Sequence, residues 1–222
     1  MKTSKISGEW TTKELQINKN WLINLDHLDK KELFKATKFA IKSNKTLYDI
    51  KDSDFPLNHF VNKINLIKKQ IQFGFGFVVI KGLPITEFND EETKVMLWGL
   101  GQYLGYPEKQ DKAGSLLHVV TDTGASFANT DHIRGFQTNE ELQFHTDGAD
   151  IFALLCIRNA KTGGLSKLVS SVAIFREIEQ NRPDLARVLQ QQFHFDSRTQ
   201  NPNDDKIQKI PIFVKHDNLI TA

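Results

Sequence analysis

The chain has 222 residues, of which 39% are hydrophobic and 25% charged, as is typical of one globular domain with a sizeable core. Its 29 basic and 27 acidic residues are interspersed and give a net charge of +2, which argues against a nucleic-acid-binding module with a clustered basic face. The longest apolar run, residues 151–157, is too short to span a membrane, and the amino terminus lacks the apolar run of a signal peptide. A lone cysteine, Cys156, excludes an internal disulfide and favours a reducing compartment. We therefore expect a cytoplasmic protein in which Cys156 is a small buried hydrophobe.

The first part of the chain is expected to be mainly helical, after an irregular or short-stranded segment at residues 1–26. Apolar residues recur at helical spacing over residues 29–43, where Asp29 is a suitable N-cap residue. A second apolar stripe predicts a helix that begins near Pro56 and ends at Gly74-Phe-Gly76. These glycines precede a strand instead of opening a helix, so they favour a turn over a phosphate-binding loop.

The remainder of the chain is expected to be richer in strands. Helical spacing and capping residues predict further helices at residues 88–104, 172–180 and 183–189. Runs of β-branched and aromatic residues predict strands at residues 77–81, 142–147, 151–157, 165–169, 193–196 and 210–215. The run at 151–157 is apolar throughout, as in a strand covered on both faces. The turn His216-Asp-Asn218 then predicts a returning strand from Leu219.

The residues with the clearest chemistry lie on the predicted strand 142–147. Side chains two positions apart on a strand point to the same face, so His145 and Asp147 are expected to project together. One imidazole and one carboxylate supply two of the three ligands of the 2-His-1-carboxylate arrangement, which holds Fe(II) and leaves its other positions open.

The spacing His-x-Asp is weak evidence by itself, because the sequence contains it three times. The pair His27/Asp29 falls at the start of a predicted helix, where a capping role for Asp29 is favoured over metal binding. The pair His194/Asp196 is interpreted as structural. The surroundings of His145 and Asp147 favour this third pair as the metal site.

Several blocks of the sequence resemble the taurine dioxygenase-like (TauD/TfdA) family over about residues 55–219. The blocks are Gly76-Phe-Val-Val-Ile-Lys-Gly-Leu-Pro84, Gly99-Leu-Gly-Gln-Tyr-Leu-Gly105, Arg134-Gly-Phe-Gln-Thr-Asn-Glu-Glu-Leu-Gln-Phe-His-Thr-Asp147, Leu154-Leu-Cys-Ile-Arg158, Gly163-Gly-Leu-Ser166 and Ser170-Ser-Val172. The block around His145 is the most specific of them.

The resemblance implies an α+β fold, namely a double-stranded β-helix (a jelly roll of the clavaminate synthase-like type) with amino-terminal helices packed on it. One domain would cover residues 1–222, mainly helical over 1–72 and a partial jelly-roll core over 73–222. It also implies an oxygenase that uses Fe(II) and 2-oxoglutarate to hydroxylate a small organic substrate. O₂ is consumed, and 2-oxoglutarate is decarboxylated to succinate and CO₂.

The resemblance also assigns roles to particular residues. His145 and Asp147 correspond to the first two iron ligands of the family. Ser166 stands where the family has a hydroxyl residue, more typically Thr, that hydrogen-bonds 2-oxoglutarate. Gln137 and Asn139 precede the metal motif, where members have residues that line the site, although hydrogen bonds within a loop explain them equally well.

Two further family residues are not recognisable in the sequence: the third ligand, a downstream His, and the Arg that pairs with 2-oxoglutarate. Only His194 and His216 follow Asp147, and His216 is better explained as a turn residue. The strand expected from Leu219 has four residues, which would leave an open jelly-roll edge. We therefore expect a chain that is incomplete at its carboxyl terminus relative to the family.

Two other functions stay open on the sequence. The first is a non-catalytic or degenerate jelly-roll binding protein that has lost the distal iron ligand. The second is a zinc or manganese cupin, which the lack of a His-x-His pattern disfavours. The expected partners are a small-molecule substrate and O₂, with no nucleic acid and no membrane, and a homo-oligomer is left open.

Overall fold

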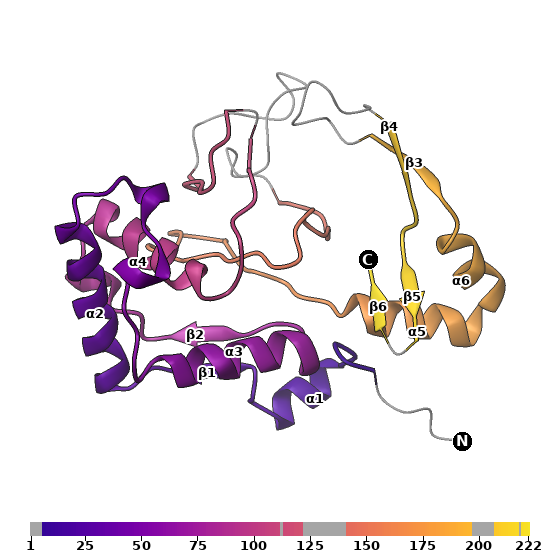
Figure 1. Ribbon diagram of the computed structural model, residues 1–222. Coiled ribbons are helices and arrows are strands. Elements are labelled where there is room, and N and C mark those ends of the chain that lie inside the picture. The colour runs from indigo at the N-terminus through magenta and orange to yellow at the C-terminus, as the bar shows by residue number, and fades with distance from the viewer. Residues whose placement is uncertain (1–5, 112, 122–140, 197–206, 218) are drawn as a thin grey trace.

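The computed structural model describes residues 6–111, 113–121, 141–196, 207–217 and 219–222 (Figure 1). The α-helices of this part are α1 (Thr12–Ile17), α2 (His27–Lys42), α3 (Val61–Phe73), α4 (Asp90–Gln102), α5 (Ser171–Asn181) and α6 (Pro183–Leu189). Three short 3-10 helices are η1 (Leu47–Asp49), η2 (Asp52–Asp54) and η3 (Ile85–Glu87). The strands are β1 (Leu22–Asn24), β2 (Val79–Lys81), β3 (Phe193–Asp196), β4 (Ile207–Ile210), β5 (Val214–His216) and β6 (Leu219–Thr221).

The larger hydrophobic core joins α2, α3 and α4 to a parallel pair formed by β1 and β2. The largest fully buried side chains in it include Leu33, Phe55, Phe60 and Met96. Helix α4 approaches the 3-10 turns closely at Gly99, where an added Cβ would lie 2.3 Å from the ring of Phe55. The expected helices and the strand in this half of the chain are confirmed, with boundaries shifted by a few residues.

Helix α2 begins at His27, two residues before the expected start, because Asp26 and not Asp29 is its N-cap. The Asp26 carboxylate accepts hydrogen bonds from the backbone N–H groups of Leu28 and Asp29. Asp29 is the third helical residue, and its carboxylate accepts the N–H of Asp26 in return. The prediction of a capping carboxylate at the start of this helix is confirmed, but the capping residue is Asp26 and not Asp29.

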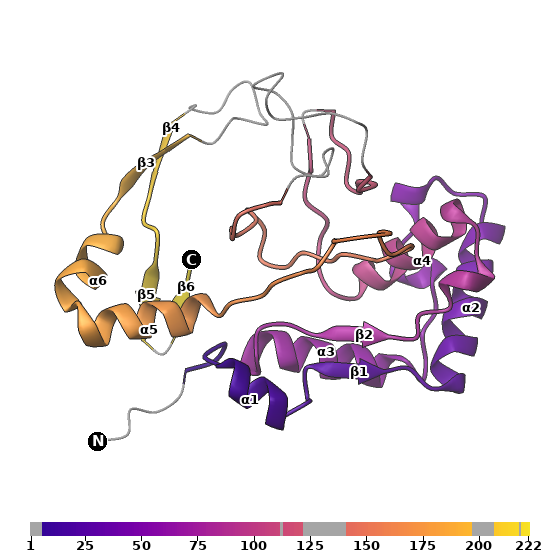
Figure 2. The same ribbon diagram turned by 180° about the vertical axis from the view of Figure 1, so that it is seen from behind.

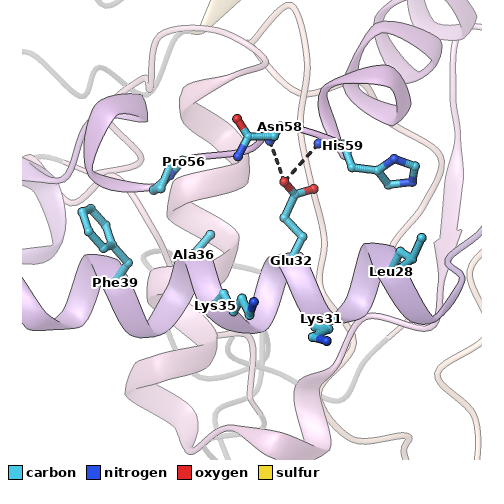
Figure 3. Close-up of a pocket in the computed structure, with 9 residues that line it drawn as sticks. All are labelled: Leu28, Lys31, Glu32, Lys35, Ala36, Phe39, Pro56, Asn58 and His59. Atoms are coloured by element: carbon cyan, nitrogen blue, oxygen red, sulfur yellow. Dashed lines mark hydrogen bonds between the residues drawn. The ribbon is translucent and has the colours of Figure 1, made fainter.

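Helix α3 begins at Val61 instead of near Pro56. Residues 56–60 are not helical, and a side chain of α2 binds backbone N–H groups of this segment. The carboxylate of Glu32 accepts hydrogen bonds from the backbone N–H groups of Asn58 and His59, at 2.6 and 3.0 Å (Figure 3). It also accepts the N–H of Phe60 at 2.6 Å. These N–H groups precede the helix and have no helical partners, so one acidic side chain from α2 stabilises the start of α3.

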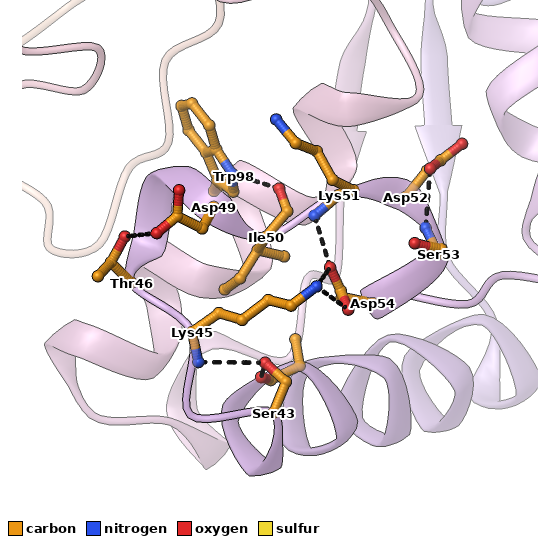
Figure 4. Close-up of polar contacts among 11 residues, drawn as sticks. Ser43, Lys45, Thr46, Asp49, Ile50, Lys51, Asp52, Ser53, Asp54 and Trp98 are labelled. Atoms are coloured by element: carbon orange, nitrogen blue, oxygen red, sulfur yellow. Dashed lines mark hydrogen bonds and ion pairs between the residues drawn. The ribbon is translucent and has the colours of Figure 1, made fainter.

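The loop between α2 and α3 is held against α4 by polar contacts (Figure 4). The indole Nε1 of Trp98 donates to the carbonyl oxygen of Ile50 at 3.0 Å. Within the loop, Lys45 Nζ lies 2.7 Å from each carboxylate oxygen of Asp54, and Asp54 also accepts the N–H of Lys51 at 3.0 Å. These bonds hold the loop with η1 and η2 in place, although the loop contains no α-helix and no strand.

A smaller core lies under α5 and α6 and includes Phe175, Phe213 and Ile220. Strands β5 and β6 form an antiparallel hairpin, which confirms the returning strand predicted from Leu219. The strand predicted at residues 210–215 is instead divided between β4 and β5. Pro211 follows β4 directly and has no N–H to donate, so a continuous ladder cannot pass through it. Ser170 Oγ donates to the carbonyl oxygen of Gly8 at 2.6 Å and so connects α5 to the amino-terminal segment.

Residues 141–169 contain no strand, so the strands predicted at 142–147, 151–157 and 165–169 are not formed. Figures 1 and 2 show this segment running, without helix or strand, between the group around α4 and helix α5. A strand needs hydrogen-bonding neighbours, and the apolar pattern of the sequence does not specify which segment supplies them. The predicted burial of the run 151–157 is also wrong: Leu154 is 76% exposed, and Cys156 is exposed.

The described residues form three two-stranded sheets, in the orders β1–β2, β3–β4 and β5–β6. The double-stranded β-helix therefore stays a prediction, with which the observed helices and small sheets do not conflict. Within the described ranges, no helix combines the length and the apolar character that crossing a membrane requires.

Candidate functional site

The structure brings His145 and Asp147 together on a segment without regular secondary structure. Nε2 of His145 lies 4.0 Å from Oδ1 of Asp147, and the side chains are 56% and 50% exposed. A nitrogen and an oxygen donor thus face the same exposed space. A metal ion bound between them would have further coordination positions open to solvent.

The tautomer of His145 follows from a hydrogen bond made by its other ring nitrogen. Nδ1 of His145 lies 2.7 Å from the carbonyl oxygen of Gln143. A carbonyl oxygen can only accept, so Nδ1 carries the proton and donates it. In the neutral imidazole Nε2 then has a free lone pair, and Nε2 is the ring nitrogen that lies 4.0 Å from Oδ1 of Asp147. Metal-binding histidines are commonly oriented by such a bond to a backbone carbonyl.

Ser166, the predicted contact for 2-oxoglutarate, is exposed and also lies outside regular secondary structure. Its neighbour Lys167 forms an ion pair with Glu141, with Nζ 2.7 Å from Oε1. This ion pair joins the segment of Ser166 to the segment that leads into His145. Gln137 and Asn139 lie outside the described residues.

Other histidines of the chain have different surroundings. His194 lies on β3 opposite Lys209 of β4, and its structural role stays a prediction. His216 ends β5 and pairs with Asp217, Nδ1 to Oδ2, at 3.4 Å. Nε2 of His118 lies 3.4 Å from Oδ2 of Asp111. His132 lies outside the described residues.

Among the residues that the structure describes, the one group of three or more metal-binding side chains is Asp26, Asp29 and His59. The sequence interpretation missed this group because His59 is 30 positions from Asp29 and no local spacing relates them. No third side chain of this kind completes a cluster with His145 and Asp147 within the same described part.

The model of the family described as "Taurine catabolism dioxygenase TauD, TfdA family" matches residues 43–221 of the chain. The chain belongs to the TauD, TfdA family. This membership confirms the resemblance carried by the block around His145.

Two curated proteins are similar to this TauD, TfdA family member. FR-33289 synthase of Streptomyces rubellomurinus is 28% identical over 193 residues, which are 87% of this chain and 57% of the relative. The taurine hydroxylase-like protein SAT17 of Stachybotrys chartarum is 25% identical over 195 residues, which are 85% of this chain and 50% of the relative. The chain thus spans about half the length of the curated relatives it matches.

The His145–Asp147 pair fits the iron that the family implies. Imidazole nitrogen and carboxylate oxygen are both donors that non-haem Fe(II) accepts. The tautomer of His145 presents a lone pair, and the exposure of both side chains leaves room for a metal and for its other ligands. The 4.0 Å between the two donor atoms is longer than the roughly 3 Å between adjacent ligands that each lie about 2 Å from one ion, so the two side chains must draw together to bind it.

Proposed function

We propose that this protein is an Fe(II)- and 2-oxoglutarate-dependent oxygenase that hydroxylates a small organic substrate. Family membership and the name of the hydroxylase-like relative support this reaction type. The observation that carries the proposal is the Nδ1 hydrogen bond of His145 to the Gln143 carbonyl, which leaves a free lone pair on Nε2, 4.0 Å from Oδ1 of Asp147.

His145 and Asp147 would hold the iron, and the Gln143 carbonyl would keep the His145 ring in the binding orientation and tautomer. With 2-oxoglutarate and O₂, the iron would supply the oxidation that gives succinate, CO₂ and the hydroxylated product. Ser166 would donate its hydroxyl proton to a 2-oxoglutarate oxygen. Gln137 and Asn139 would line the substrate space.

We further propose a single oxygenase domain over residues 1–222. Its mainly helical part would be residues 1–72, and residues 73–222 would be the jelly-roll part. The ion pair between Lys167 and Glu141 and the bond of Ser170 to Gly8 support this view, because they join segments that are distant in sequence.

Anaerobic titration of the protein with Fe(II) and 2-oxoglutarate tests the proposal, with the visible charge-transfer band of the chelate as the readout. We expect a saturable band in the wild type that is lost in His145→Ala. His216→Ala is a matched control, because His216 is also an exposed histidine beside an aspartate, and it should keep the band. A wild type without a band would contradict the proposal and favour a non-catalytic binding protein. A band unchanged in His145→Ala would contradict the role of His145 as an iron ligand.

A further inference from the structure

A second cluster of metal-binding side chains lies at the start of α2, away from the His145–Asp147 pair in the sequence. Asp26, Asp29 and His59 each offer one ligand atom, and these atoms all lie within 4.8 Å of one another. Asp29 is fully buried, whereas Asp26 and His59 are exposed. We call these three residues the Asp29 cluster.

The reciprocal capping of α2 uses only one oxygen of each carboxylate in this cluster. Oδ1 of Asp26 accepts the N–H groups of Leu28 and Asp29, at 2.8 and 3.0 Å. Oδ2 of Asp29 accepts the N–H of Asp26 at 3.0 Å, and Nζ of Lys63 lies 3.5 Å from the same oxygen. The capping bonds and the lysine therefore leave Oδ1 of Asp29 to other partners.

Oδ1 of Asp29 is buried and has no hydrogen-bond partner among the described residues. A buried carboxylate oxygen without a donor is costly, and native proteins usually pair such an atom with a donor, a water or an ion. Nε2 of His59 lies 3.7 Å from this oxygen. This separation is too long for a hydrogen bond, and the two atoms need to draw only slightly together to bind one metal ion.

The position of His59 is set by its backbone. Its N–H donates to Glu32 of α2 at 3.0 Å, and its imidazole extends toward the Leu28 end of α2 (Figure 3). His59 and Leu28 lie at the same end of an open groove of about 570 Å³ along α2. The groove gives an ion from solvent a route to the imidazole.

We propose that Asp26, Asp29 and His59 form a binding site for a divalent transition-metal ion of the Zn²⁺ class. One imidazole and two carboxylates form a nitrogen and oxygen ligand set of the kind that Zn²⁺ accepts. The buried Oδ1 of Asp29 is the fixed ligand. The exposed side chains of Asp26 and His59 close onto the ion. Lys63 neutralises part of the negative charge from the opposite oxygen of Asp29, so it does not occupy the metal position.

This proposal does not rest on the proposed oxygenase function, and the test separates the two sites. The full chain carrying His145→Ala is titrated with Co²⁺, whose visible absorbance reports nitrogen and oxygen ligands, and Zn²⁺ is then used to displace it. We expect one Co²⁺ per chain and its displacement by Zn²⁺. Adding His59→Gln should weaken Co²⁺ binding by at least about tenfold. Adding His216→Gln, a matched exposed histidine, should leave Co²⁺ binding unchanged.

A second variant removes a ligand and keeps the helix cap. Asp26→Ser retains a good N-cap residue, so α2 should stay folded by circular dichroism while Co²⁺ binding weakens by at least about tenfold. Equal Co²⁺ affinity in the presence and absence of His59→Gln would overturn the proposal. Absence of Co²⁺ binding in the His145→Ala protein would also overturn it.

Discussion

The indole Nε1 of Trp98 on α4 donates a 3.0 Å hydrogen bond to the backbone carbonyl of Ile50, across 48 positions of sequence. Both residues are buried, with exposed fractions of 5% and 1%. Trp98→Phe keeps an aromatic ring but leaves the Ile50 carbonyl without this donor. We expect a loss of about 1–3 kcal/mol in the free energy of unfolding, measured by urea denaturation. Trp21→Phe is the control, since its bond to the Leu15 carbonyl is only partly buried, and a cost as large as that of Trp98→Phe would contradict this explanation.

The close approach of α4 to Phe55 predicts opposite effects for two glycines of the same helix. A Cβ at Gly99 would lie 2.3 Å from the fully buried Phe55 ring, so Gly99→Ala should destabilise the protein by about 1–3 kcal/mol. A Cβ at Gly101 meets no atom within 4 Å, so Gly101→Ala should stabilise the protein by about 0.5–1 kcal/mol through helix propensity. Thermal unfolding of both variants checks the prediction, which two changes of the same sign would contradict.

Local sequence patterns predict some parts of this fold and fail for others. The helices around Leu33 and Met96 follow from apolar spacing and are confirmed, although the N-cap of the first is Asp26 and not Asp29. The start of α3 differs because Glu32 caps it from another helix, and a one-dimensional pattern holds no sign of that contact. The strands predicted over residues 142–169 are not formed, because a run of strand-favouring residues gives a preference for strand but does not specify its hydrogen-bonding partner.

The candidate site was predictable to a similar extent. His145 and Asp147 lie 4.0 Å apart, as their spacing predicted, although the strand on which that prediction rested is not formed. The bond of His145 to Gln143 depends on backbone geometry, so the sequence could not specify the tautomer. The Asp29 cluster needs the packing of α2 against the turn that holds His59, and only the folded structure shows it.

The pKa of Glu179 on α5 should report the contact between α5 and β5. A hydrogen bond from Lys215 is the main cause that lowers this pKa below its ordinary value of 4.5, with opposition from burial and help from Arg176. Lys215→Gln should therefore raise the pKa of Glu179 in an NMR titration of its side-chain carbon. An unchanged pKa in Lys215→Gln would show that Arg176 alone holds it down.

The sign for stability follows from the same shift. Because the pKa of Glu179 is lower in the folded state, its contribution is fully present above pH 4.5 and is lost as the pH falls through the folded pKa. Lys215→Gln should thus reduce the free energy of unfolding at neutral pH and flatten its fall in acid. Urea denaturation at a series of pH values measures this, and parallel pH curves for the two proteins would contradict it.

The exposed thiol of Cys156 predicts reactivity in the native state. Its Sγ lies 3.3 Å from Oδ1 of Asn159 on the exposed segment, not in a core as its apolar neighbours suggested. One maleimide per native chain should react, counted by mass spectrometry, and Cys156→Ser should not react. Protection that is lost only in denaturant would show that Cys156 is buried.

Ser166 provides a test of the proposed cofactor contact that keeps the fold unchanged, because the residue is exposed. Loss of one hydrogen bond in Ser166→Ala should weaken 2-oxoglutarate binding by about 2- to 10-fold. Ser166→Thr keeps the hydroxyl and should bind as the wild type does. The measurement is the 2-oxoglutarate concentration at half saturation of the charge-transfer band, at fixed Fe(II). Equal affinity in Ser166→Ala would remove Ser166 from the cofactor contacts and leave the roles of His145 and Asp147 untouched, because these rest on their own ligand geometry.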